Sequence, residues 1–202
     1  MKTFIQLFLS FIFSLISSDA VLAFKPSNAE YSANVAIETK DGSFHTKVFN
    51  SASHERREMN AGGTNMIMII NKESKVMSML MPDEGMYMEI SGKSLMGNMA
   101  PKQPEMNDYN FEQTEVGKET VNGVATTKYK MIMTNKAKPD EKLGGFFWLS
   151  KEDILIKMDA ISVDKKRKDR IKIDLTDLKV EKQSKSLFEI PSNLQKMSMP
   201  GF

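Results

Sequence analysis

Methionines spaced two residues apart are the groups in this sequence best suited to a chemical role. The chain of 202 residues holds 17 methionines, and 11 of them lie between Met59 and Met106. In an extended strand, side chains two residues apart point to the same side. Three consecutive extended segments would therefore each present a methionine ladder to a common surface. The ladders are Met66 and Met68, then Met77, Met79 and Met81, then Met86 and Met88.

These ladders are open to several interpretations. Methionine is unbranched and polarizable, so a surface of it can repack around flexible acyl chains, and the seven residues would then line an apolar ligand-binding groove. The same property suits an ordinary core, which a sheet needs in any case. Thioethers also select copper(I), although ladders buried on a sheet face give a metal ion poor access. We expect the ligand groove. The alternatives are a Cu(I)-binding protein and a structural or interaction protein without a small ligand.

The remaining composition argues against enzymatic chemistry. There is no cysteine, which excludes thiolate metal sites and cysteine nucleophiles, and His45 and His54 are the only histidines. No hydrolase elbow, zinc-protease motif or phosphate-binding loop is present. The 28 Lys+Arg and 26 Asp+Glu give a net charge of +2, which is too even for a typical nucleic-acid-binding domain. We expect a non-enzymatic protein with no catalytic residues, cofactor, metal site or nucleic-acid partner.

Two further motifs have plain structural interpretations. The run His54-Glu55-Arg56-Arg57-Glu58 alternates charges and is typical of a solvated strand. The pairs Gly62-Gly63 and Gly144-Gly145 precede strand patterns rather than helices, so we expect turns or bulges there.

The N-terminus has the features of a secretory signal peptide. Lys2 precedes an apolar run from Phe4 to Ile16, and Val21-Leu22-Ala23 supplies a cleavage signal of small residues. This run is short for a membrane span, which needs about 20 apolar residues. We expect residues 1–23 to be removed and residues 24–202 to form a single soluble domain. Its expected location is the periplasm, with secretion as the alternative.

Strands must position the methionines, because period-two patterning runs through almost the whole mature chain. Turn signals such as Asp41-Gly42 and Asn122-Gly123 separate the segments. We expect an all-β protein with minor helix, in which a strongly curved antiparallel sheet of about 11 strands forms an incomplete β-barrel. The expected strands are Tyr31–Ile37, Phe44–Phe49, Arg56–Met59, Asn65–Ile70, Val76–Met81, Met86–Ile90, Tyr109–Lys118, Ala125–Thr134, Phe146–Leu149, Ile154–Val163 and Ile171–Leu175, with a last extended piece at Ser186–Pro191.

The segment Ser91–Asp108 interrupts this rhythm with several glycines and prolines. Segments of this length in compact domains are either functional lids or plain connections. If the segment is a lid, Leu95, Met96 and Met99 are expected to fold over the open side of the sheet.

Five stretches together resemble a known protein family. These stretches are RREM at Arg56–Met59, KVMSMLMPDEGMYMEI at Lys75–Ile90, TEVGKETVNGVATTKYKM at Thr114–Met131, FFWLSKEDILIKMDA at Phe146–Ala160 and SLFEIPSNLQKMSMPG at Ser186–Gly201. They are similar to exported bacterial proteins that carry a domain of unknown function built on the fold of the outer-membrane lipoprotein carrier (LolA/LolB-like).

The resemblance implies a half-barrel whose concave face holds a lipid or the acyl chains of a lipoprotein, with an envelope protein as a candidate partner. We expect the protein to be a monomer. In the carrier, an arginine on an early strand contacts the lid, and either Arg56 or Arg57 occupies a comparable place. The carrier also begins with an amphipathic helix, for which residues 24–30 with Pro26 are too short. The resemblance therefore implies the fold and not lipoprotein traffic itself.

Overall fold

The described part of the protein is almost entirely β-structure. The computed structural model describes residues 27–40, 42–91, 109–163 and 168–197. Within these ranges two short 3-10 helices accompany twelve strands. The expected all-β class with minor helix is confirmed.

The first six strands follow one another through short turns. They are β1 (Tyr31–Thr39), β2 (Gly42–Asn50), β3 (His54–Ala61), β4 (Thr64–Asn71), β5 (Val76–Met81) and β6 (Met86–Ser91). Gly62 and Gly63 have φ angles of 66° and 95° in the turn between β3 and β4, a region that favours glycine. The 3-10 helix Pro82–Glu84 joins β5 to β6 and ends at Gly85, whose φ of 66° forms a left-handed cap.

The next five strands form a second series of hairpins. They are β7 (Tyr109–Val121), β8 (Val124–Asn135), β9 (Lys142–Ser150), β10 (Leu155–Val163) and β11 (Lys168–Val180). A 3-10 helix at Lys185–Phe188 and the short strand β12 (Gln195–Lys196) complete the described chain.

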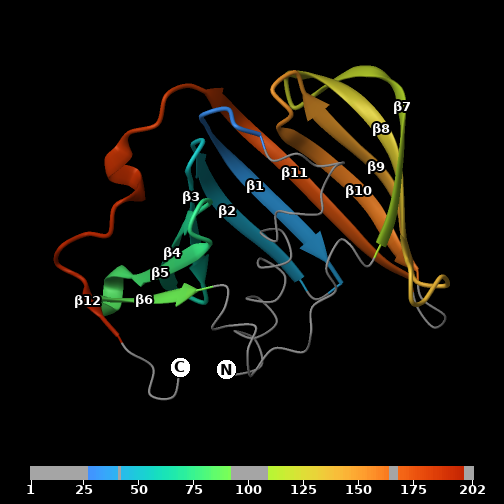
Figure 1. Cartoon of the computed structure of the whole chain (residues 1–202). Helices are drawn as coiled ribbons and strands as arrows, with labels where there is room; N and C mark the ends of the chain where they lie inside the picture. Colours follow the sequence, from blue (N-terminus) through green and yellow to red (C-terminus); the bar gives the residue numbers. More distant parts are fainter. Residues whose placement is uncertain (1–26, 41, 92–108, 164–167, 198–202) are drawn as a thin grey trace.

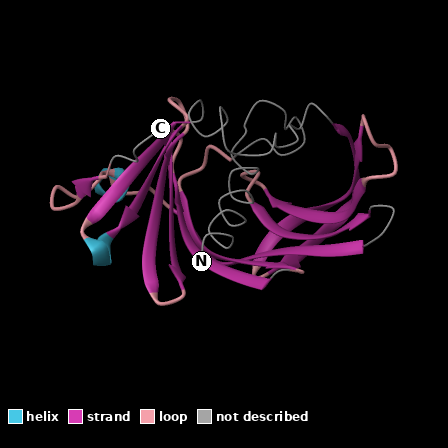
Figure 2. Ribbon diagram, turned by 90° about the horizontal axis from the view of Figure 1, so that it is seen from below, coloured by secondary structure: helices cyan, strands magenta, loops and turns pink. Residues whose placement is uncertain are grey.

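All twelve strands belong to one sheet with the order β12-β6-β5-β4-β3-β2-β1-β11-β10-β9-β8-β7 (Figure 1). The strand β1 joins the two series, because it pairs with β2 on one side and with β11 on the other, both in antiparallel register. The terminal strand β12 runs parallel to β6. Figure 2 shows that the sheet curves into an open trough rather than closing. The expected curved antiparallel sheet of about eleven strands is therefore confirmed.

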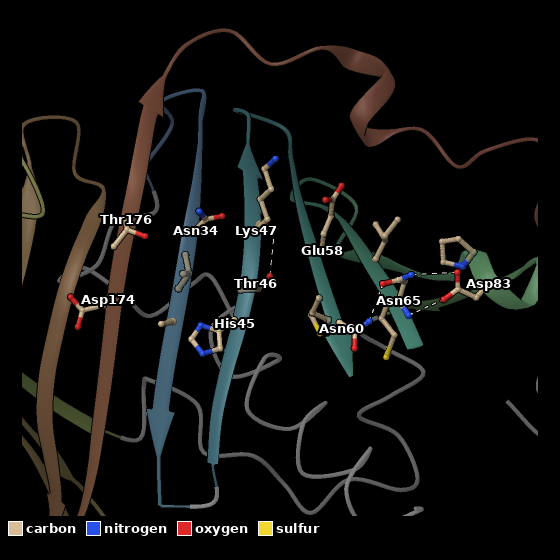
Figure 3. Close-up of a pocket in the computed structure, with 16 residues that line it drawn as sticks. Asn34, His45, Thr46, Lys47, Glu58, Asn60, Asn65, Asp83, Asp174 and Thr176 are labelled. Atoms are coloured by element: carbon tan, nitrogen blue, oxygen red, sulfur yellow. Dashed lines mark hydrogen bonds between the residues drawn. The ribbon is translucent and has the colours of Figure 1, made fainter. Parts of the chain in front are cut away.

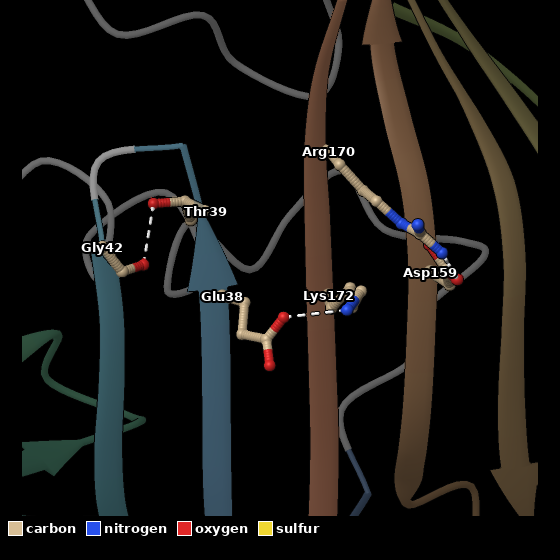
Figure 4. A network of polar contacts seen from close by, with 6 residues as sticks. All are labelled: Glu38, Thr39, Gly42, Asp159, Arg170 and Lys172. Carbon is tan, nitrogen blue, oxygen red and sulfur yellow. Dashed lines mark hydrogen bonds and ion pairs between the residues drawn. The ribbon is translucent and has the colours of Figure 1, made fainter.

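The two faces of the sheet differ in character. The concave side faces the viewer in Figure 1. Val35 and Ile37 of β1 lie opposite Leu175 and Ile173 of β11, and strand alternation places them on the side away from Glu38 and Lys172. Charged pairs occupy the convex side (Figure 4). There Lys172 donates a hydrogen bond of 2.9 Å to Glu38, and Arg170 donates bonds of 2.8 and 2.5 Å to Asp159.

The buried apolar side chains form separate clusters on the two faces. Three clusters line the concave face, around Met68, around Leu175 and around Phe147. A fourth cluster lies on the convex face, where Leu194 of the C-terminal segment packs against Leu80. The C-terminal segment therefore completes a core on the outer side of β4 and β5.

The sheet splits between β2 and β3. These strands pair only where Lys47–Asn50 lies against Glu55–Glu58. Beyond this point residues 42–46 pair with β1 alone, and residues 59–61 pair with β4 alone.

Some local expectations are wrong. Gly144 and Gly145 lie inside β9, each opposite residues of β8 and β10, rather than in a turn. The piece Ser186–Pro191 is not an extended strand, because the chain forms a 3-10 helix at Lys185–Phe188. The lid residues Leu95, Met96 and Met99 lie outside the described residues.

Candidate functional site

The methionine ladders meet on the concave face of β3–β6. In the strand register Met68 lies opposite Met79, which in turn lies opposite Met88. Met68, Met77 and Met79 are 2%, 3% and 5% exposed, and Met66 and Met88 pack against them. Met81 and Met86 lie opposite each other at the end of the hairpin next to the 3-10 helix. The cluster also contains Met59, Ile70 and Ile90.

A charged residue stands within this apolar surface. Arg57 of β3 lies opposite Val48 of β2 and opposite Met68 of β4. Its Nε donates a hydrogen bond to Oε1 of Glu55, two residues earlier on the same strand and therefore on the same face. The side chains of Arg57 and Glu55 are only 14% and 18% exposed. The expectation of a solvated strand is wrong for these two residues.

A small group of polar residues lies next to the ion pair of Arg57 and Glu55. Tyr31 and Glu55 both lie opposite Asn50. Lys72 Nζ donates hydrogen bonds of 2.7 Å to Oδ1 of Asn50 and to the carbonyl of Ser51. The concave face therefore combines a methionine surface with a small polar group at its edge.

Burial and charge change the ionisation of this group. Burial raises the pKa of Tyr31, with a further increase from the Glu55 carboxylate, so its hydroxyl stays protonated. Burial lowers the pKa of Lys72, and Glu55 opposes this effect. Burial alone would also lower the pKa of Arg57, but Glu55 outweighs it and the pKa is raised. Arg57 therefore remains a cation.

A cleft of about 750 Å³ lies where β2 and β3 diverge (Figure 3). Its lining combines polar side chains of the convex face, among them His45, Lys47, Glu58 and Asn60, with Met59 and Met66 of the methionine cluster. At one end the backbone N–H of Asn65 donates a hydrogen bond of 3.0 Å to Asp83. The described residues contain no group of three or more His, Asp or Glu side chains that could hold a metal ion. They also contain no helix long and apolar enough to cross a membrane.

The sequence contained a signal for the buried ion pair. Glu55, Arg57 and Met59 share one strand parity, and Met59 is buried at 8% exposure in the methionine cluster. The same parity places Arg56 on the opposite face, where its Nη1 donates a hydrogen bond to the carbonyl of Leu187. Of the two candidate arginines, Arg57 is therefore the one on the concave face.

The sequence profile of a domain of unknown function, DUF4412, matches residues 32–159. Among solved structures, an uncharacterized conserved protein from Thermus thermophilus is similar with a TM-score of 0.54 at 11% identity, over 93% of this chain and 98% of that one. A DUF1329 family protein from Desulfovibrio piger gives a TM-score of 0.36 at 16% identity, over 93% and 98%. A domain from Vibrio parahaemolyticus named for outer membrane lipoprotein sorting gives 0.28 at 10% identity, over 89% and 94%. No curated protein matches the chain. The first likeness shows a shared fold.

Proposed function

The chain belongs to the family of the domain of unknown function DUF4412, and we propose that it is a non-enzymatic binding protein for a lipid or for the acyl chains of a lipoprotein. The ligand lies on the concave face, against the methionines of β4–β6. The observation that carries this proposal is the convergence of Met66, Met68, Met79 and Met88 on that face of an open sheet.

The chemistry of this surface suits a flexible apolar ligand. Thioether side chains change shape easily and can follow the bends of an acyl chain. Burial contributes about 0.8 kcal/mol for each CH₂ group, so a sixteen-carbon chain offers on the order of 10 kcal/mol before the costs of association. That is sufficient for stable binding without any covalent step.

The location and partners of the protein follow from the same proposal. The N-terminal sequence favours export into the periplasm, where lipids and lipoproteins of the envelope are available. The protein acts as a monomer that receives its ligand from, or delivers it to, an envelope protein.

Native mass spectrometry of the exported protein, purified under gentle conditions, tests the proposal. We expect a population carrying lipid or lipoprotein. The matched variants are Met88→Gln, at the partly buried edge of the methionine cluster, and Met197→Gln, at a side chain that is 37% exposed. The first should lose lipid and the second should retain it. A clean ligand-free mass of the wild-type protein would contradict the proposal.

A double substitution separates acyl binding from the copper(I) alternative. Met77→Leu with Met79→Leu removes two thioethers and preserves apolar volume, at a cost typically below about 1.5 kcal/mol. We expect lipid binding to survive this change. Stoichiometric Cu(I) uptake that is lost in the double variant would favour the metal-binding alternative instead.

A further inference from the structure

Arg57 is an unusual residue for the position it occupies. Its neighbours on the concave face are Val48, Met68 and, on its own strand, Met59. Two of these belong to the buried methionine cluster, and Val48 is itself 4% exposed. Arginine is seldom placed in such surroundings unless its charge is paired, and an apolar residue there would support the sheet equally well.

The pairing of Arg57 leaves part of the guanidinium available. Its Nε is bonded to Glu55, and within the described part of the chain Nη1 and Nη2 have no hydrogen-bond partner. Every fully buried side-chain nitrogen or oxygen there has a partner, so these two nitrogens are still reached by solvent. Two N–H groups of one guanidinium edge fit the two oxygens of a carboxylate or phosphate.

The charge around Arg57 also favours an anion. Among the described residues, Glu55 is the one carboxylate that acts electrostatically on both Arg57 and Lys72. The group therefore carries a net charge of +1 when the nearby Tyr31 hydroxyl is protonated. An excess positive charge beside an apolar surface is complementary to an amphiphile with an anionic head.

We propose that the acyl ligand is anionic, and that the Nη groups of Arg57 bind its carboxylate or phosphate while its chain lies against Met66 and Met88, the partly buried members of the methionine cluster. This inference rests on the proposed function and narrows it to one class of lipid. Glu55 orients the guanidinium through Nε and leaves its other edge free for the ligand.

Three amphiphiles with the same twelve-carbon chain test the proposal: dodecanoate, dodecyl phosphate and dodecanol. Calorimetric titration of the full exported chain below micellar concentrations gives their affinities. A hydrogen bond to a charged group changes affinity by roughly 10- to 100-fold, so we expect the anions to bind that much more tightly than the alcohol. Tighter binding of dodecanoate identifies a fatty acid as the source of the head group, and tighter binding of dodecyl phosphate identifies a phospholipid.

Paired variants separate a ligand contact from a structural role. Arg57→Gln should abolish the preference for the anions and leave dodecanol binding unchanged. The control is Arg56→Gln, because Arg56 is also ion-paired and is 13% exposed but faces the other side of the sheet. Glu55→Gln should strengthen anion binding, since it removes the competing carboxylate. A purely structural ion pair would instead make both Arg57→Gln and Glu55→Gln weaken binding of all three compounds.

The outcomes distinguish this inference from the proposed function. If dodecanol and both anions bind equally to the wild-type protein, the anionic site is refuted and the apolar groove stands. If none of the three binds, the groove itself is refuted, and the anionic site with it.

Discussion

Gly145 marks a close approach between two strands of the sheet, and replacing it gives a sharp test of the fold. It lies in β9 opposite Met131 of β8 and Ala160 of β10. A methyl group added at Gly145 would stand 2.6 Å from the Cα of Ala160 and closer still to the carbonyl oxygen of Asp159. Both atoms belong to the backbone of β10, so the strands would have to move apart.

Gly145→Ala and Gly144→Ala are therefore expected to have opposite effects. Overpacking against atoms that cannot yield typically costs about 1–3 kcal/mol, and Gly145→Ala should lower the free energy of unfolding by this amount. At Gly144 the nearest atom to an added methyl group is the carbonyl oxygen of Met131, at 3.8 Å, an ordinary contact. Gly144→Ala should stabilise the protein by about 0.4–1 kcal/mol, because alanine restricts the unfolded chain.

Urea unfolding followed by tryptophan fluorescence measures both variants. Trp148 is the only tryptophan, is 7% exposed and lies in the same strand, so its emission reports on the affected region. With a denaturant slope of about 2 kcal/mol/M, the midpoint for Gly145→Ala should fall by about 0.5–1.5 M. A Gly145→Ala midpoint at or above that of Gly144→Ala would refute the close approach of β9 and β10.

Three further predictions concern single side chains. The hydrogen bond from Trp148 Nε1 lowers the pKa of Glu119, so the tryptophan emission should change with a midpoint below the ordinary glutamate value of 4.5, and Glu119→Gln should abolish this change. Leu194→Ala should lower the free energy of unfolding by about 2–3 kcal/mol, because it leaves a cavity under the C-terminal segment, and an unchanged urea midpoint would contradict that packing. The pKa of Asp159 is lowered chiefly by hydrogen bonds from Arg170, so this carboxylate stabilises the fold at neutral pH and the stabilisation is lost as the pH falls through the lowered pKa. Asp159→Asn should therefore unfold at lower urea than wild type near neutral pH, and the difference should vanish in acid.

The strands could be predicted from the sequence, but not all of the pairings between them. Alternation and turn residues such as Asn122-Gly123 define each hairpin locally, so most strand ranges could be predicted. The pairing of β1 with β11 has no local signal, because nothing in either strand specifies a partner far along the chain. The 3-10 helix at Lys185–Phe188 is held by contacts of Phe188 with the convex cluster, which likewise depend on the finished sheet.

The candidate site, like the fold, could be predicted from the sequence only in part. The shared faces of the methionines could be predicted from strand parity, and the register places Met68 beside Met79 as that parity requires. The charge alternation around Arg57 concealed its position, since a solvated strand and a strand with one buried ion pair have the same pattern. The parity that Arg57 shares with Met59 indicates its face, but the burial of the ion pair follows only from the placement of β3 between β2 and β4.

The position of β1 at the centre of the sheet has a consequence for the order of assembly. Every antiparallel pairing except that of β1 with β11 joins strands that follow one another in the chain, but Ile37 and its partner Ile173 are 136 positions apart. Hairpins between consecutive strands form within microseconds, whereas closing a long loop carries an entropic cost that slows folding. During synthesis one edge of β1 therefore stays open until β11 has emerged, and the trough becomes continuous only in that late step.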